Sequence, residues 1–171
     1  MIRHGESTAN RESIIAGRLD VLLTDTGRAQ ARALQVLKWP EAYRLFASPM
    51  QRAQDTCSLG FPSHAFHTHP GLRERDWGIF EGRPLAELPK RETRPKQGED
   101  WVEMIDRVAG ALHDCCTLAK GKLPILICHS GVIRAARILA GQSDTGTRPA
   151  NAHPIYFKWT GRGHQEAFYD I

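Results

Sequence analysis

The chain has 171 residues, which is enough for one domain with its own hydrophobic core. Hydrophobic residues make up 41% and charged residues 25%, a composition that excludes a collagen, a coiled coil and a wholly disordered chain. No apolar run approaches the roughly 20 residues of a membrane span, and no secretory signal is visible. We therefore expect no membrane partner.

The formal net charge at pH 7 is +4, and the 23 lysines and arginines are spread along the chain. This distribution fits either a solvated basic surface or a site that attracts anionic substrates. No basic arm with interleaved aromatic residues is present, so we expect no nucleic-acid partner. The four cysteines lack zinc-binding spacing, which predicts reduced thiols in a cytoplasmic protein; they are Cys57, Cys115, Cys116 and Cys128.

Two helices and a strand are predicted in the first third of the chain. A helix is expected over 24–37, with a threonine as its N-cap and with Val36 on its apolar face. The apolar segment 43–47 predicts a strand. Ser48 is expected to cap a second helix that starts with a proline and runs to about residue 57.

The second half of the chain predicts a long helix over 99–119 and a continuous apolar strand over 124–128. A further helix is expected over 131–139, and two closing strands over 155–159 and 167–171. Strands that alternate with helices predict an α/β fold, which we expect to be a three-layer α/β/α sandwich with a mainly parallel central sheet.

The segment 83–98 differs from its neighbours because it is rich in proline and in basic residues. We expect one domain over 1–171, with this segment as a short lid-like insertion over one face. A plain surface connection is the alternative interpretation.

Several chemically active side chains fall where a parallel sheet would gather them. His129 follows the predicted strand 124–128, and ligands of open α/β sheets bind at such strand ends. Arg52 lies in the first turn of a helix, where an anion is its natural partner because a cation opposes the helix dipole. His4 near the start of the chain and Glu74 between two arginines are weaker signals. A surface histidine and a surface salt bridge are their ordinary interpretations.

Taken in order, these segments resemble the histidine phosphatase superfamily, the group related to cofactor-dependent phosphoglycerate mutase. The resemblance covers nearly the whole chain. It rests on the opening Arg-His-Gly-Glu-Ser, on Ser48-Pro49 with Arg52 three residues further on, on Leu72-x-Glu74 with Gly78 and Glu81-Gly82, on Gly98-Glu99, and on His129.

The resemblance implies a phosphoglycerate mutase-like fold and a phosphohistidine mechanism. His4 would be the nucleophile, and its other ring nitrogen should donate to a backbone carbonyl. Glu74 would protonate the leaving alkoxide and then activate water. Arg3, Arg52 and His129 would surround the phosphoryl oxygens.

Three further positions match the family near the substrate, and a fourth departs from it. Asn10 would donate to the phosphate, and the backbone N–H of Ser130, where many members have glycine, would face it. Gly17 and Trp77 match positions nearer the substrate body, although a half-buried core position is an equal alternative for the tryptophan. The partner implied is a small anionic phosphate ester, and no metal or other cofactor is required.

Two other sets of residues are assigned no chemistry. His64, His67 and His69 have the spacing of a strand with alternating faces, and no cysteine or carboxylate cluster accompanies them, so we expect no metal site. Cys128 belongs to an apolar strand, where a free cysteine is ordinarily inert packing.

The start of the chain departs from the family. Members carry several apolar residues before Arg-His-Gly as a central first strand, whereas only Met1 and Ile2 precede it here. We expect the true start of the protein to lie upstream.

The resemblance leaves three functions open, of which we favour a phosphomonoesterase. The mutases carry a longer insertion with paired arginines, and 83–98 is short and has no adjacent arginine pair. A shorter lid excludes water less well, which favours hydrolysis over re-transfer. The alternatives are mutase-type phosphoryl transfer and a protein phosphohistidine phosphatase or non-catalytic phosphate-binding protein. The oligomeric state has no signal in the sequence.

Overall fold

The computed structural model describes residues 1–143 and 145–168. Its centre is a parallel sheet with the strand order β1-β4-β2-β3. The strands are β1 (Ile2–Arg3), β2 (Tyr43–Ala47), β3 (Phe66–Thr68) and β4 (Leu123–Cys128). An antiparallel hairpin follows, formed by β5 (Ile155–Trp159) and β6 (His164–Phe168).

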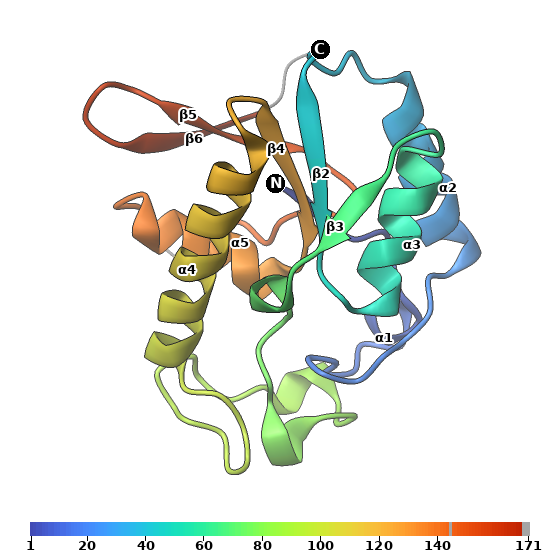
Figure 1. Cartoon of the computed structure of the whole chain (residues 1–171). Helices are drawn as coiled ribbons and strands as arrows, with labels where there is room; N and C mark the ends of the chain where they lie inside the picture. The colour runs from blue at the N-terminus through green and yellow to red at the C-terminus, as the bar shows by residue number, and fades with distance from the viewer. Residues whose placement is uncertain (144, 169–171) are drawn as a thin grey trace.

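Helices cover both faces of the sheet, as Figure 1 shows. On one side lie α2 (Asp25–Ala33) and α3 (Gln51–Gly60), and on the other lie α4 (Trp101–Ala119) and α5 (Ser130–Leu139). A short helix α1 (Thr8–Arg11) follows β1. Single 3₁₀ turns are formed by Leu34–Val36, Pro70–Leu72, Gly78–Phe80 and Leu85–Glu87. The predicted α/β fold with a mainly parallel sheet is thus confirmed. No helix of the described part of the chain is long and apolar enough to cross a bilayer.

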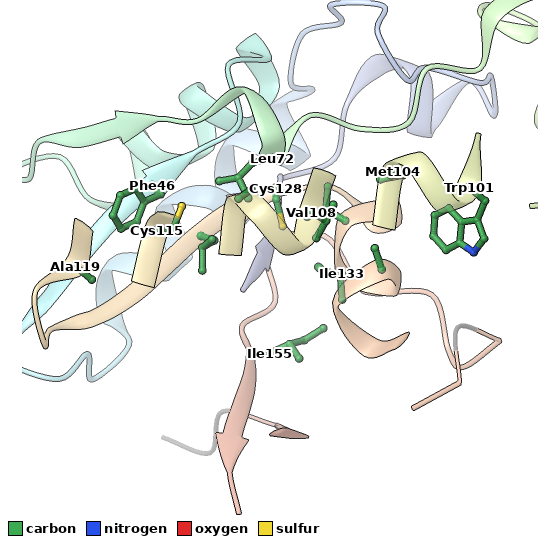
Figure 2. Close-up of a cluster of buried hydrophobic side chains, with 14 residues drawn as sticks. Phe46, Leu72, Trp101, Met104, Val108, Cys115, Ala119, Cys128, Ile133 and Ile155 are labelled. Atoms are coloured by element: carbon green, nitrogen blue, oxygen red, sulfur yellow. The ribbon is translucent and has the colours of Figure 1, made fainter. Parts of the chain in front are cut away.

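Each face of the sheet has its own hydrophobic core, because successive side chains of a strand point to opposite faces. Ile125 and Ile127 of β4 pack towards α3, while Leu126 and Cys128 pack towards α4 and α5. Figure 2 shows the second core, which α4 lines along its length with buried residues that include Met104. The sheet is therefore fixed from both sides, and so are the ends of its strands.

Most predicted elements are confirmed, and the differences occur at helix ends. The helix expected over 24–37 ends at residue 33 and continues as a 3₁₀ turn, and Val36 is 82% exposed. The buried face of α2 consists instead of Gly27 and Ala31, with Leu34 following them. Ser48 does not cap α3, whose N-cap is Met50. The last predicted strand begins three residues early, at His164, and its expected positions 169–171 lie outside the described residues.

The segment 83–98 is held against the body of the domain by main-chain contacts. Pro84 forms a bridge with Ile14. At the far end, the buried guanidinium of Arg75 donates to the carbonyl oxygens of Arg91, Thr93 and Glu99, over 2.9–3.0 Å. The ring of Trp77 lies 4.6 Å from this guanidinium, on which it stacks.

Shortening a side chain should destabilise the protein most in the central strand β4. Ile127 is fully buried, so Ile127→Ala should lower the free energy of unfolding by about 3 kcal/mol through lost burial and a residual cavity. Val36→Ala, at the exposed position, should change it by less than about 0.5 kcal/mol. Urea unfolding of both variants measures the difference, and equal effects would contradict the packing described here.

Candidate active site

The candidate site lies at the carboxyl ends of three adjacent strands. The parallel register of β1 and β2 on either side of β4 brings the three strand ends level. The residue after each strand therefore emerges at one edge of the sheet, and these residues are His4, His129 and Ser48. The ring centroids of the two histidines lie 5.1 Å apart. Two histidines that are distant in sequence are thus brought into contact by strand pairing alone.

The tautomer of His4 is fixed by a hydrogen bond. Its Nδ1 lies 2.7 Å from the carbonyl oxygen of Gly5, which can only accept, so Nδ1 carries the proton. Burial, followed by the positive charges of Arg52 and Arg3, holds the pKa of His4 well below its ordinary value of 6.5. The ring is therefore neutral, and Nε2 retains its lone pair. This is the arrangement expected from the family resemblance.

His129 is fully buried behind His4 and is not itself part of the pocket wall described below. Its Nε2 lies 2.8 Å from Ser48 Oγ, and its Nδ1 is buried without a hydrogen-bond partner. Burial and then the charge of Arg52 hold the pKa of His129 well below its ordinary value. Its ring is therefore neutral as well.

Arg3 and Arg52 are buried beside these histidines and are held by carbonyl oxygens. Arg3 Nη1 donates to Pro149 over 2.9 Å, whereas Arg3 Nε is buried without a partner. Burial, and then the charge of Arg148, lower the pKa of Arg3 to about 10, so it remains a cation at neutral pH. Arg52 donates to the carbonyls of residues 16, 17 and 19 over 2.7–3.2 Å.

Gly17 supports Arg52 through its carbonyl oxygen, and its neighbour Ala16 lines the pocket described below, so a place for Gly17 near the substrate stays a prediction. The carboxylate of Glu81 accepts from the backbone N–H of Gly17 and of its two successors, and also from that of Trp77. A Cβ atom on Gly17 would overlap the carbonyl oxygen of Arg75. This glycine is therefore required for close packing, which gave it the same sequence signal as a binding residue.

Glu74 presents its carboxylate at the start of α5. One oxygen accepts from the backbone N–H of Arg75 at 2.9 Å, and the other accepts from the N–H of Gly131 at 3.0 Å. A Cβ atom on Gly131 would meet the first of these oxygens. The position of Glu74 thus depends on a residue without a side chain.

A pocket of about 340 Å³ opens above this cluster. Of the predicted site residues, it is lined by Arg3, His4, Asn10, Arg52, Glu74, Trp77 and Ser130. One wall is apolar, formed by Ile14, Ile15, Ala16, Leu85, Leu88 and Pro89. The segment 83–98 supplies the last three of these, together with Lys90 and Arg91, so it forms one side of the pocket.

Asn10 is oriented by two donors to its side-chain oxygen. Oδ1 accepts from the backbone N–H of Ser7 and from Asn151 Nδ2, both over 3.2 Å. Because the oxygen is engaged, Asn10 Nδ2 is the end of the amide available to a ligand. Asn151 Nδ2 also donates to the carbonyl oxygen of His4 over 2.8 Å, so it couples the two predicted site residues.

Four residues of this region have positions that their sequence context does not predict. Ser48 looked like a helix cap, and Asn151 lies in a segment that carries no motif. Arg75 has no predicted role beyond its place beside Glu74, yet it is 1% exposed and anchors the segment 83–98. Arg148 lines the pocket from the chain after α5. The tryptophan two residues after Arg75, on whose ring the guanidinium stacks, is the local sequence signal that could have indicated a buried arginine.

Cys128 takes no part in this chemistry. Its thiol is fully buried in the core beside α4, and burial raises its pKa to about 12. The expectation that it serves as packing is confirmed.

A family model described as the histidine phosphatase superfamily (branch 1) matches residues 1–153. The chain belongs to this superfamily. The resemblance drawn from the sequence motifs is therefore confirmed over most of the chain.

Relatives within the superfamily carry mutase and phosphatase names. The chain is 33% identical over 147 residues to the probable phosphoglycerate mutase GpmB of Cronobacter sakazakii. The match covers 75% of this chain and 67% of that protein. It is 27% identical over 172 residues to the metal-independent phosphoserine phosphatase of Arabidopsis thaliana, and that match covers 89% of this chain and 72% of the relative. A phosphatase or phosphotransferase is the class of enzyme that these relatives support.

Solved structures agree with the fold. The protein TTHB049 from Thermus thermophilus superposes with a TM-score of 0.77 at 28% identity, and covers 93% of this chain and 92% of its own. A putative alpha-ribazole-5'-P phosphatase from Escherichia coli gives a TM-score of 0.84 at 21% identity, and covers 98% and 92%. The latter shows the shared histidine phosphatase fold alone.

The two buried neutral histidines predict an acid-labile fold. Below pH 6.5 the unfolded chain takes up protons at His4 and His129 that the folded chain does not, so the free energy of unfolding falls as the pH falls. For each histidine the slope is about 0.7 kcal/mol per pH unit at pH 6.5 and approaches about 1.4 well below it, which amounts to about 1 kcal/mol between pH 6.5 and 5.5. Denaturant unfolding between pH 6.5 and 5.5 measures it. His129→Gln should remove about half of the slope, and the exposed-site variant His113→Gln should leave it unchanged. A flat profile for the native chain would contradict the neutral assignment.

Proposed function

We propose that this protein hydrolyses small anionic phosphomonoesters through a phosphohistidine on His4, with Glu74 as the proton donor and without a metal ion. The observation that carries the proposal is the state of His4. Its Nδ1–H is tied to Gly5, so the lone pair of Nε2 is held in a pocket that Arg3, Arg52 and Glu74 also line.

Unpartnered polar groups beside His4 support an anionic ligand. Arg3 Nε and His129 Nδ1 are the buried side-chain atoms of the described residues that make no hydrogen bond. Such groups cost free energy in the empty site, and phosphoryl oxygens would satisfy them. Ser48 would donate its hydroxyl proton to His129 Nε2, which makes Nδ1 the donor.

In the first step, the lone pair of His4 Nε2 attacks phosphorus and the ester P–O bond breaks. The proton of the Glu74 carboxyl group passes to the leaving alkoxide, and an alcohol is released. Arg3 and Arg52 stabilise the charge on the equatorial oxygens. The Nδ1–H bond to Gly5 stabilises the positive charge that the substituted imidazole acquires.

In the second step, water attacks the phosphorus of the phosphohistidine while the Glu74 carboxylate takes its proton. The P–N bond breaks, its electron pair returns to His4 Nε2, and inorganic phosphate leaves. The proton gained by Glu74 restores the starting state, so the cycle consumes one ester and one water.

The wall formed by 83–98 favours hydrolysis over transfer. It has no adjacent arginine pair, and its Leu88 and Lys90 are exposed, so water reaches the pocket beside them. Phosphoryl transfer between two positions of one substrate is the second candidate, supported by the mutase name of a relative. We place the enzyme in the cytoplasm, in keeping with its four free cysteines.

The test is phosphate release from a panel of phosphomonoesters in the presence of a chelator. The wild-type protein should turn over at least one ester, and His4→Ala should show no turnover while it retains weakened binding of inorganic phosphate. Acid-labile, base-stable labelling of the wild-type protein by a radioactive ester would identify the phosphohistidine. Turnover that survives in His4→Ala, or that the chelator abolishes, would overturn the proposal. Isomerisation of a phosphoglycerate without phosphate release would favour the second candidate.

The role of Glu74 is tested at Gly131 without altering the acid itself. Gly131→Ala places a methyl group against the carboxylate, which must move, so we expect a loss of about 100-fold in kcat with alkyl phosphates. The loss with p-nitrophenyl phosphate should be much smaller, because its leaving group needs little protonation. Gly110→Ala is the matched control, since a Cβ atom there meets open space in α4. Equal losses with both esters would contradict the assignment of Glu74 as the acid.

A further inference from the structure

Glu81 has no part in the mechanism proposed above, yet its carboxylate accepts four backbone N–H groups. Oε1 accepts from the N–H of Arg18 and from that of Trp77, each over 3.0 Å. Oε2 accepts from the N–H of Gly17 over 3.0 Å and from that of Leu19 over 3.3 Å. Each oxygen therefore receives two donors. A neutral amide in the same place would offer one accepting oxygen and would set its own N–H groups against the remaining donors.

Two of these N–H groups belong to peptide units whose carbonyl groups hold Arg52. The peptide between residues 16 and 17 donates its N–H to Glu81, and its oxygen accepts from Arg52 Nη2 over 3.2 Å. The peptide between residues 17 and 18 makes the same pair of contacts, and its oxygen lies 2.8 Å from Arg52 Nη2. The carboxylate and the guanidinium are thus joined by two peptide groups, each of which contacts both.

The direction of these peptide groups favours both of their contacts. The N–H end of a peptide unit is the positive end of its dipole, and it faces the carboxylate of Glu81. The carbonyl end is negative and faces the guanidinium of Arg52. Linked hydrogen bonds of this kind polarise one another, so the charge of Glu81 strengthens the hold on Arg52. Burial lowers the pKa of Arg52, and nearby acids, Glu81 among them, oppose that lowering.

The turn that carries Glu81 is also tied to the loop that it holds. The backbone N–H of Gly82 donates to the carbonyl oxygen of Ile15 over 2.8 Å, and the N–H of Ile15 donates to the carbonyl oxygen of Arg83 over 2.8 Å. Arg52, which is 1% exposed, lines the pocket from behind this loop. The position of its guanidinium therefore depends on where the carbonyl groups of 16–19 are fixed.

We propose that Glu81 is a positioning residue for Arg52, and that its carboxylate acts through two peptide groups to orient the guanidinium towards the transferred phosphoryl group. This inference rests on the proposed function and adds a residue to it. A carboxylate in direct contact with Arg52 would occupy its donors and cancel its charge. The intervening peptide groups avoid both effects, because they transmit the hold of Glu81 and leave the positive charge directed into the pocket.

Glu81→Gln tests this role, because an amide cannot accept all four N–H groups. We expect kcat/KM to fall about 30-fold in Glu81→Gln and about 100-fold in Arg52→Met. The double variant should lose no more than Arg52→Met alone, since Glu81 acts through the guanidinium that is then absent. Losses that multiply to about 3000-fold would overturn the inference.

The choice of ester separates this role from a general disturbance of the pocket. All phosphomonoesters present the same phosphoryl oxygens, so Glu81→Gln should lower kcat/KM equally with p-nitrophenyl phosphate and with an alkyl phosphate. A displaced Glu74 would lower it more with the alkyl phosphate, as expected for Gly131→Ala. A loss in Glu81→Gln that is confined to the alkyl phosphate would therefore contradict the assignment to Arg52.

Asp20→Asn is the matched control for charge. The charge of Asp20 also opposes the lowering of the pKa of Arg52, and its Oδ1 accepts from the backbone N–H of Gln51 over 2.8 Å, a bond that an asparagine can keep. This variant should lose less than about threefold in kcat/KM, because no peptide group bearing on Arg52 is released. Equal losses in Asp20→Asn and Glu81→Gln would overturn the inference in favour of a general effect of charge.

Urea unfolding establishes whether each variant is folded. Glu81→Asp keeps the charge and withdraws it by one methylene group, so it takes the place of Glu81→Gln in every comparison if the glutamine variant does not fold. The same pattern is then expected with smaller losses. Activity of Glu81→Asp and Glu81→Gln that both match the wild-type protein would show that the carboxylate does not position Arg52.

Binding of inorganic phosphate separates this inference from the proposed function. In His4→Ala protein, which cannot form a phosphohistidine, adding Glu81→Gln should weaken phosphate binding about tenfold by calorimetry, and adding Asp20→Asn should leave it unchanged. Equal binding with and without Glu81→Gln would overturn the positioning role whether or not the wild-type protein is a phosphatase. A tenfold loss of binding in a protein that turns over no ester would overturn the phosphatase alone.

Discussion

The register of three parallel strands is the constraint on which the site depends. β1 contributes only two residues, yet its pairing with β4 fixes where His4 emerges, and the pairing of β2 with β4 does the same for Ser48. A shift of one residue in the β1–β4 pairing would displace His4 from His129, a shift in the β2–β4 pairing would displace Ser48 from His129, and either shift would reverse the faces of the shifted strand. The two hydrophobic cores prevent such a shift, because alternate residues of β4 are committed to opposite faces. The core therefore determines the position of the site as well as the stability of the fold.

The buried arginines of the site form their hydrogen bonds with main-chain carbonyl oxygens. Arg3, Arg52 and Arg75 are almost fully buried, and within the described residues their guanidinium groups donate to carbonyl oxygens of the main chain. A carbonyl oxygen satisfies a donor without cancelling its charge, whereas a carboxylate would do both. The positive potential is therefore retained at the place where a phosphoryl group would bind. Burial, together with the same potential, lowers the pKa of both histidines and keeps them neutral.

The sequence predicted the fold class, the order of the main elements and the family, because apolar periodicity and strand-end motifs are local signals. It also predicted the tautomer of His4 through the family resemblance. It did not predict the roles of Gly17, Ser48 and Asn151. Gly17 faces a carbonyl from residue 75, Ser48 meets a histidine 81 positions away, and Asn151 contacts residues 4 and 10. Contacts of this kind depend on the assembled sheet, and no short window of sequence contains both partners. The apolar face predicted for the helix over 24–37 was wrong for a related reason. In α2 it is Gly27 that packs against the rest of the protein, and it contacts the backbone of Glu6, which follows β1.

The way in which Arg75 holds the segment 83–98 has a consequence for how this enzyme could diversify. The hydrogen bonds from its guanidinium to the region 91–99 all end on main-chain oxygens, which every amino acid possesses. The path of the segment is thus independent of most of its side chains, and these can be exchanged while the wall keeps its place. The side chains of 83–98 on the pocket wall could therefore change with little penalty to folding, whereas a change of Arg75 would release the main chain of the whole wall. Selection for a differently shaped pocket would act first on the side chains of the segment whose main chain this one arginine holds in position.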